Sequence, residues 1–200
     1  MPEAMEVEDY INSADDPWSL KKTGLIQERA EMIRKEISGR NVLDVGGGFG
    51  FYSEFLRKNG SDTICMDKSE KMVSEGKKMF QELQFVMADA VKMPFRDEKF
   101  DFMLCMGTLI YIEEKDSFFL EARRVLKPNG RILIYERNRN SFLHKFVRIF
   151  KNTEKEADNP NDFMSIKDIK KLSDDNNFII LKSGGSYSDF VFALMEKKGA

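Results

Sequence analysis

Three carboxylates and a cluster of glycines are the residues whose types and spacing could do chemistry in this sequence. Asp44 interrupts the apolar run Val42–Val45, and four of the five residues after Val45 are glycine. Asp67 and Asp89 each follow a later apolar run. Carboxylates accept hydrogen bonds from hydroxyl, amino and ammonium groups, and glycines let a ligand approach the backbone closely. The combination is typical of a site for a polar, nucleoside-like ligand.

The elements that must position these residues are short strands of a parallel sheet. Residues 42–45 are largely apolar and β-branched, which predicts a strand buried on both faces. A helical stretch, 51–58, follows the glycines. Since open α/β sheets bind ligands at the carboxyl ends of their strands, this strand, turn and helix predict a cofactor cradle.

The glycine spacing decides between two classes of cofactor. The dinucleotide pattern G-x-G-x-x-G fails in both registers, because its third position is Phe51 in one and its first is Val45 in the other. The pattern D-x-G-x-G-x-G matches without a gap, at Asp44, Gly46, Gly48 and Gly50. An ordinary glycine-rich turn is the alternative.

Asp67 and Asp89 extend the predicted site to the next two strands, expected at 62–66 and 85–87. Asp67, 17 positions beyond Gly50, can accept two hydrogen bonds from the vicinal hydroxyls of an adenosine ribose. NAD enzymes use the same device, so Asp67 indicates a nucleoside without identifying it. Asp89 can accept a hydrogen bond from an adenine amino group, or it serves as a turn or cap residue. Ser69 is expected to cap a helix at 70–80.

Composition limits the class of protein. The 200 residues suit one domain, and a net charge of −2 gives no case for a general nucleic-acid binder. Cys65 and Cys105 lie inside predicted strands, so we interpret them as reduced core residues of a cytoplasmic protein and expect no metal site. No apolar run reaches membrane-spanning length, and the acidic N-terminus is unlike a signal peptide.

The segment from Asn41 to Glu136 resembles the class I S-adenosylmethionine-dependent methyltransferases, in particular the ubiquinone-biosynthesis or type 11 small-molecule enzymes. Besides the glycine motif, the resemblance rests on a D-A-x-x-L-P-F-like segment, on F-D at the fourth strand, and on an L-K-P-G-G-like turn. The matching residues are Asp89, Ala90, Met93, Pro94, Phe95, Phe100, Asp101, Leu126, Lys127, Pro128, Asn129 and Gly130. Asparagine replaces the first glycine of the turn, which stays possible because asparagine tolerates positive φ.

This resemblance implies the fold, the cofactor and its site. The fold is an α/β, Rossmann-like three-layer sandwich with a seven-stranded, mostly parallel sheet, whose antiparallel last strand lies beside the fifth. The loop Gly46–Gly50 would pass the methionine part of S-adenosylmethionine, Asp44 would hold its ammonium, and Asp67 and Asp89 would bind ribose and adenine. The expected cofactor-binding residues are Asp44, Gly46, Gly47, Gly48, Gly50, Asp67, Lys68, Asp89, Ala90, Met106 and Gly107, the last two near the sulfonium and the acceptor.

No general base is evident. Many relatives carry a histidine after the fourth strand, where this chain has Tyr111. Tyr111 and His144, the only histidine, remain the candidate catalytic residues, with packing as the alternative for both. Methyl transfer is an in-line displacement in which positioning can supply about 7–11 kcal/mol, so thiol, amine, acidic phenol or carbon acceptors need no dedicated base.

Residues 137–151 form a basic amphipathic segment, predicted to be a helix. Its five cations have no acid among them: Arg137, Arg139, Lys145, Arg148 and Lys151. The segment belongs to a predicted insertion, 137–163, that by resemblance helps to form the acceptor site. It could also contact an anionic lipid surface, or pack on the domain with a solvated basic rim. Residues 1–40 are expected to form an arm and a helix, a candidate lid on the single domain 41–200.

Three function classes follow. The sequence favours methyl transfer to a small-molecule or lipid-like acceptor. A cofactor-binding subunit without activity is the first alternative, and an RNA or protein methyltransferase is the second. The second alternative lacks the N/D-P-P-Y/F motif of base-nitrogen methylases, since residues 105–108 are Cys-Met-Gly-Thr. No nucleic-acid partner is expected.

Overall fold

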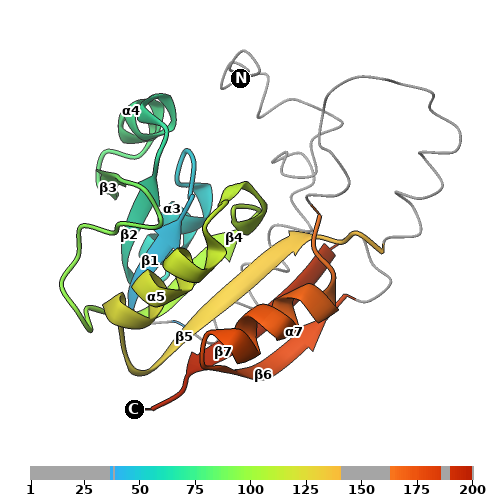
Figure 1. Ribbon diagram of the computed structural model, residues 1–200. Helices are drawn as coiled ribbons and strands as arrows, with labels where there is room; N and C mark the ends of the chain where they lie inside the picture. Colours follow the sequence, from blue (N-terminus) through green and yellow to red (C-terminus); the bar gives the residue numbers. More distant parts are fainter. Residues whose placement is uncertain (1–36, 38, 141–162, 186–189, 200) are drawn as a thin grey trace, which may run out of the picture.

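A seven-stranded sheet forms the centre of the computed structural model, which describes residues 37, 39–140, 163–185 and 190–199 (Figure 1). The strand order is β3-β2-β1-β4-β5-β7-β6, and β7 runs antiparallel to both of its neighbours. The strands are β1 Asn41–Val45, β2 Asp62–Asp67, β3 Gln84–Met87, β4 Phe100–Met106, β5 Leu126–Arg137, β6 Phe178–Gly184 and β7 Phe190–Lys197. The predicted fold class is confirmed, including the place of the reversed last strand.

Two of the helices begin at serine caps, and the cap at Ser69 was predicted. Ser69 Oγ accepts a hydrogen bond from Met72 N at the start of α4, and Ser165 forms a capping box with Asp168 at the start of α7. The described helices are α3 Phe51–Lys58, α4 Glu70–Met79, the 3-10 turn η2 Leu109–Tyr111, α5 Lys115–Val125 and α7 Ile166–Asp175. Asn129 has a φ of 59°, so the turn before β5 uses asparagine in the left-handed region as expected.

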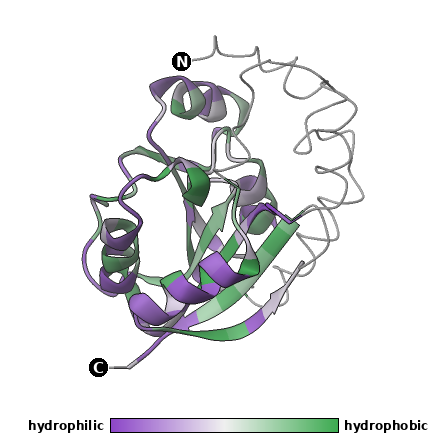
Figure 2. Cartoon of the chain, turned by 45° about the vertical axis from the view of Figure 1, so that its right-hand side comes forward, coloured by the Kyte–Doolittle hydropathy of each residue, from purple (hydrophilic) through white to green (hydrophobic). Residues whose placement is uncertain are grey.

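Alternate residues of each strand build two separate core layers. Leu43, Met103 and Ile134 face α5 and α7, which lie in front of the sheet in Figure 1. Val42, Phe102 and Leu133 face α3 on the opposite side. Hydrophobic residues therefore occupy most of each central strand, and the strands are mostly green in Figure 2, whereas the helices mix green and purple.

The C-terminal hairpin is longer than predicted. The sequence suggests a sixth strand ending at Leu181, but β6 continues to Gly184 because it pairs with β7 along most of its length. The predictions for residues 1–36, among them the lid, lie outside the described residues. Within the part of the chain that the structure describes, no helix has the length and apolarity needed to cross a membrane.

Candidate functional site

Two rims of the sheet meet where the strand order reverses between β1 and β4. We call the carboxyl ends of β1 to β3 with their following loops the β1–β3 rim; it carries Asp44, Asp67 and Asp89. We call residues 106–111 with Glu136, at the carboxyl ends of β4 and β5, the β4–β5 rim. Such a switch point is where α/β sheets bind ligands.

The glycine loop is fastened to the end of β2. Gly46 N and Gly47 N donate to the carbonyl oxygen of Met66 at 2.7 and 3.2 Å. Gly48 N donates to Asp67 Oδ2 at 2.9 Å, and the other oxygen of Asp67 accepts from Ser69 N at 2.8 Å. Asp67 thus holds the loop and the start of α4 in one arrangement, which brings two predicted site residues together.

Individual glycines of this loop serve different purposes. A Cβ built on Gly50 would lie 2.7 Å from side-chain atoms of Leu83 and Phe85, so Gly50 is needed for packing. A Cβ on Gly48, whose φ is 57°, would meet nothing within 4 Å. Of these two glycines, only Gly48 leaves open space that a ligand could fill.

Asp44 lies under the loop. Its side chain is 2% exposed, and its Oδ2 accepts from Ser53 Oγ at 2.6 Å. Burial, opposed by the Ser53 hydrogen bond and reinforced by the negative charge of Asp67, raises the pKa of Asp44 to about 6. Two carboxylates that repel each other near the glycine loop favour a cationic group there.

Lys68 and Asp89, both predicted site residues, form an ion pair between the ends of β2 and β3. Lys68 Nζ lies 2.7 Å from Asp89 Oδ2, and both side chains are exposed. Asp89 Oδ1 also accepts from Val91 N at 3.2 Å, while Ala90 packs against the main core. The Lys68 hydrogen bond lowers the pKa of Asp89, so this carboxylate is ionised at neutral pH.

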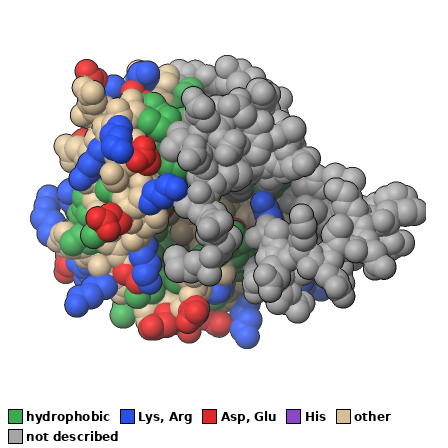
Figure 3. All heavy atoms as spheres, turned by 90° about the horizontal axis from the view of Figure 1, so that it is seen from above, with side chains coloured by type: hydrophobic (Ala, Val, Ile, Leu, Met, Phe, Trp, Pro, Cys, Tyr) green, Lys and Arg blue, Asp and Glu red, His purple; other side chains and the backbone are tan. Residues whose placement is uncertain are grey.

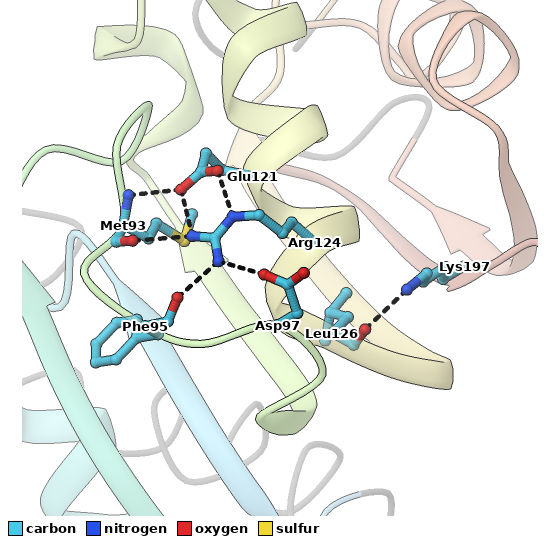
Figure 4. A network of polar contacts seen from close by, with 7 residues as sticks. All are labelled: Met93, Phe95, Asp97, Glu121, Arg124, Leu126 and Lys197. Atoms are coloured by element: carbon cyan, nitrogen blue, oxygen red, sulfur yellow. Dashed lines mark hydrogen bonds and ion pairs between the residues drawn. The ribbon is translucent and has the colours of Figure 1, made fainter.

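The chain after β3 has no regular structure up to Phe100, and a side-chain clasp holds it (Figure 4). Arg124 of α5 donates to the carbonyl oxygens of Phe95 and Met93, at 2.6 and 2.9 Å. It also pairs with Asp97 and Glu121, and Glu121 accepts from Met93 N at 2.7 Å. The clasp ties the loop that begins with Asp89 to a rigid helix.

The β4–β5 rim touches the glycine loop directly. Gly107 N donates to the carbonyl oxygen of Tyr135 at 2.7 Å, and Thr108 Oγ1 donates to the Gly46 carbonyl oxygen at 3.3 Å. Met106 is almost buried, whereas Tyr111 is 70% exposed. The predicted residues Met106 and Gly107 therefore lie beside the loop, and Tyr111 has room to meet a ligand.

Glu136 is a residue of this rim that the sequence reasoning missed. It is 0% exposed, and its Oε1 accepts from Leu109 N at 2.6 Å. Its Oε2 has no hydrogen-bond partner among the described residues. Burial raises the pKa of Glu136 to about 8. The sequence does offer one signal for it, because Glu136 is a single acid that directly follows the apolar run Ile132–Tyr135 of β5.

The start of the basic segment is part of the fold. Arg139 Nε donates to the carbonyl oxygen of Phe163 at 2.8 Å, and its Nη2 lies 3.7 Å from Asp168. Arg137 lies over the Phe163 ring, 5.7 Å from its centroid. The other predicted features of this segment, including His144, fall in 141–162, outside the described residues.

The described surface carries charges of both signs, and the described titratable side chains form no metal site. On the face shown in Figure 3, Lys and Arg side chains of the described residues are intermixed with Asp and Glu. No group of three or more His, Cys, Asp or Glu side chains in the described ranges could hold a metal ion. Cys65 and Cys105 are both free and buried.

Comparisons with known proteins agree with this geometry. Residues 43–134 match the family model described as a methyltransferase domain. The chain is 32% identical over 106 residues to a demethylmenaquinone methyltransferase of Renibacterium salmoninarum, which covers 53% of this chain and 45% of that protein. The chain thus spans less than half the length of this named relative.

Two longer matches extend over most of the chain. An uncharacterized protein of Methanocaldococcus jannaschii is 28% identical over 179 residues, 90% of this chain and 84% of that one. A crystal structure of an S-adenosylmethionine-dependent methyltransferase from Aquifex aeolicus superposes with a TM-score of 0.72 at 19% identity, covering 98% of this chain and all of that one. At this identity the second match establishes a shared fold.

Proposed function

We propose that this chain, a class I S-adenosylmethionine-dependent methyltransferase, transfers a methyl group to a small-molecule or lipid-like acceptor. One observation carries the cofactor site: the glycine loop is held by Asp67 and leaves open space beside Gly48. Both the strand-end position and the acid at the next strand suit an adenosine-containing ligand.

The residues of the β1–β3 rim fit this cofactor in chemical type. A carboxylate has about four lone-pair sites, and Asp67 uses two of them for Gly48 N and Ser69 N, so it can still accept from ribose hydroxyls. Asp89 would accept from the adenine amino group, beside Lys68. The negative charge of Asp44 would stabilise the ammonium of the methionine part from beneath the loop. When bound, the cofactor supplies a methyl group already activated on a sulfonium.

The β4–β5 rim would then position the acceptor. Met106 and Gly107 lie at the end of β4, beside the glycine loop, and Tyr111 offers an exposed hydroxyl for orientation. The named relative acts on demethylmenaquinone, by its description, which supports an aromatic, apolar acceptor for this chain. For an acidic phenol or an activated carbon, positioning would carry the catalysis without a dedicated base.

Two segments would surround the site, the insertion 137–163 and the N-terminal residues 1–40. The insertion 137–163 would border the acceptor and contact an anionic membrane surface through its cations, and residues 1–40 would act as a lid. The buried free thiols of Cys65 and Cys105 fit a reducing compartment such as the cytoplasm.

The proposal is tested by binding and by methyl transfer. Calorimetry should show binding of S-adenosylmethionine or S-adenosylhomocysteine and no binding of NADH. Transfer of a tritiated methyl group to fractionated cell extract then separates an enzyme from a cofactor-binding subunit without activity. Binding of NADH alone would overturn the cofactor assignment, and cofactor binding without transfer to any fraction would favour the subunit.

A further inference from the structure

Glu136 stands apart from the other acids of the site because it is buried and one of its oxygens has no hydrogen-bond partner among the described residues, whereas the buried Asp44 accepts from Ser53 Oγ. Asp67 and Asp89 lie at the surface of the rim and bind backbone or lysine nitrogens, but Glu136 has no exposed area. A buried carboxyl with an unused oxygen costs free energy, so its presence calls for an explanation beyond packing.

The position of Glu136 connects it to both halves of the site. Its Oε1 accepts from Leu109 N, at the start of η2. The preceding residue, Thr108, donates to the Gly46 carbonyl oxygen of the glycine loop. A chain of two hydrogen bonds therefore runs from Glu136 through residues 108 and 109 to the cofactor loop. The contact is close, since a Cβ on Gly46 would clash with the side chain of Thr108.

We propose that Glu136 is a positioning residue that, in its neutral form, holds residues 107–111 against the glycine loop. The inference rests on the proposed function, because these residues would lie between cofactor and acceptor. The neutral form fits the geometry, since Oε1 accepts a hydrogen bond while Oε2, which meets no donor among the described residues, carries the proton. Ionisation would place an unsolvated charge behind the loop and strain this arrangement.

The groups around Glu136 set the pH range. Burial keeps the carboxyl protonated at neutral pH, with a pKa of about 8. The backbone N–H groups of residues 108–110 and the charge of Lys115, at the start of α5, act in the opposite direction. On β4, the thiol of Cys105 has a pKa raised well above its ordinary value and stays neutral. Asp44, which also acts on Cys105, titrates lower, at about 6.

The test compares wild type with Glu136→Gln and Glu136→Ala, using calorimetric binding of S-adenosylhomocysteine from pH 7 to pH 9. Glutamine reproduces the neutral carboxyl, so Glu136→Gln should bind within about 3-fold of wild type at pH 7. At pH 9 wild type should bind about 5- to 10-fold more weakly than Glu136→Gln. Comparing the two proteins at each pH removes the titration of the ligand's own amine. Parallel pH profiles would overturn the proposal.

A second measurement does not need the cofactor. Hydrogen exchange of the Leu109 amide in the unliganded protein should be faster in Glu136→Ala than in wild type at pH 7, and unchanged in Glu136→Gln. Equal exchange in all three proteins would overturn the holding role. If wild type fails to bind S-adenosylhomocysteine, the proposed function fails, and this exchange experiment still decides on Glu136. If Glu136→Ala does not fold, Glu136→Gln decides by itself.

Ser173→Ala is the matched control. Ser173 is fully buried and its Oγ donates to the Phe178 carbonyl oxygen at 3.1 Å, between α7 and β6 and away from the rim. Removing this bond should lower stability without altering the pH profile of binding or the exchange of Leu109. A change of either readout in Ser173→Ala would make the Glu136 effect a general consequence of lost stability, and would overturn the proposal.

Discussion

Apart from Asp44, which is buried beneath the glycine loop, the acids of the two rims lie in different surroundings. On the β1–β3 rim, Asp67 and Asp89 are satisfied by backbone N–H groups and by Lys68. On the β4–β5 rim, Glu136 is enclosed, and one of its oxygens has no partner in the described part of the chain. The β1–β3 rim thus holds Asp67 and Asp89 in place as hydrogen-bond acceptors, as the proposed cofactor site requires. The β4–β5 rim keeps its acid away from water, although Tyr111 of the same rim is exposed.

The difference has a physical origin in the strands. β2 and β3 end in short turns at the side of the sheet, where carboxylates reach solvent and neighbouring N–H groups. β4 and β5 are central, α5 packs on one face of the sheet, and residues 107–111 follow the end of β4. Burial at the centre of the sheet raises the pKa of Glu136, whereas the hydrogen bond from Lys68 lowers the pKa of Asp89 at the edge.

The largest expected effect distinguishes two glycines of the β1–β3 rim: Gly50, which is needed for packing, and Gly48, which leaves open space for a ligand. Gly50→Val would force a side chain into Leu83 and Phe85 at a positive φ, and should destabilise the fold by about 3 kcal/mol or more. Gly48→Ala enters open space and should cost about 1–2 kcal/mol from its positive φ, but weaken cofactor binding about 10-fold. Urea unfolding and calorimetry measure the two quantities. Equal loss of stability in both variants would contradict the division.

Arg124→Ala should loosen the loop that begins at Asp89. It removes bonds to two carbonyl oxygens and two carboxylates, and a loss of about 2–3 kcal/mol in the free energy of unfolding is expected. Cofactor affinity should fall as well. Arg123→Ala is the control, because Arg123 lies outside the clasp: it donates to the Asn177 carbonyl oxygen and lies over the Phe178 ring. Similar unfolding curves for both variants would argue against the clasp.

Asp67→Ala tests the acid that joins the glycine loop to β2. Losing hydrogen bonds to a charged group should weaken S-adenosylhomocysteine binding by about 1.5–3 kcal/mol, roughly 10- to 150-fold. Asp62→Ala, at the exposed opposite end of the same strand, should bind like wild type. Calorimetry that finds the two variants indistinguishable would remove Asp67 from the site.

Glu136→Gln tests whether the buried acid of the β4–β5 rim makes the free energy of unfolding depend on pH. The folded pKa of about 8 lies above the ordinary value of 4.5, so the native state binds more protons than the unfolded state between these values. Wild type should therefore lose stability relative to Glu136→Gln as pH rises, by about 2 kcal/mol between pH 6 and 8. Urea unfolding at both pH values measures this difference. A constant difference would show that Glu136 does not titrate between pH 6 and 8 in the folded protein, contrary to the expectation.

The smallest expected effect concerns membrane binding by the basic segment 137–151, which follows Glu136 in the chain. Arg139 bonds to Phe163 and approaches Asp168, so replacing it would disturb the fold. Lys145→Gln with Arg148→Gln is the cleaner test, with each cation expected to contribute about 1 kcal/mol to binding at an anionic surface. Sedimentation with anionic vesicles should recover less of this variant than of wild type. If wild type itself does not sediment, the membrane contact is wrong.

Much of the first rim could be predicted because its signals are local. A strand, a glycine turn and an acid at the next strand end are read from neighbouring residues, and Ser69 and Ser165 cap their helices from one turn away. The bond from Asp67 to Gly48 N was not predicted, since it depends on how the loop folds back over β2. The clasp around Arg124 was also missed, because it joins Met93 to a helix residue that follows 31 positions later.

The sequence by itself determined the fold class, the strand order around the reversed last strand, and the positions of Asp44, Asp67 and Asp89 at strand ends. These follow from hydrophobic runs, glycines and a family resemblance, which are all properties of the chain in order. Only the tertiary structure decided the state of each carboxyl. Glu136 resembles any acid at the end of a strand until β4, η2 and α5 enclose it. Its burial, and with it the pKa of about 8, arises from segments distant in sequence.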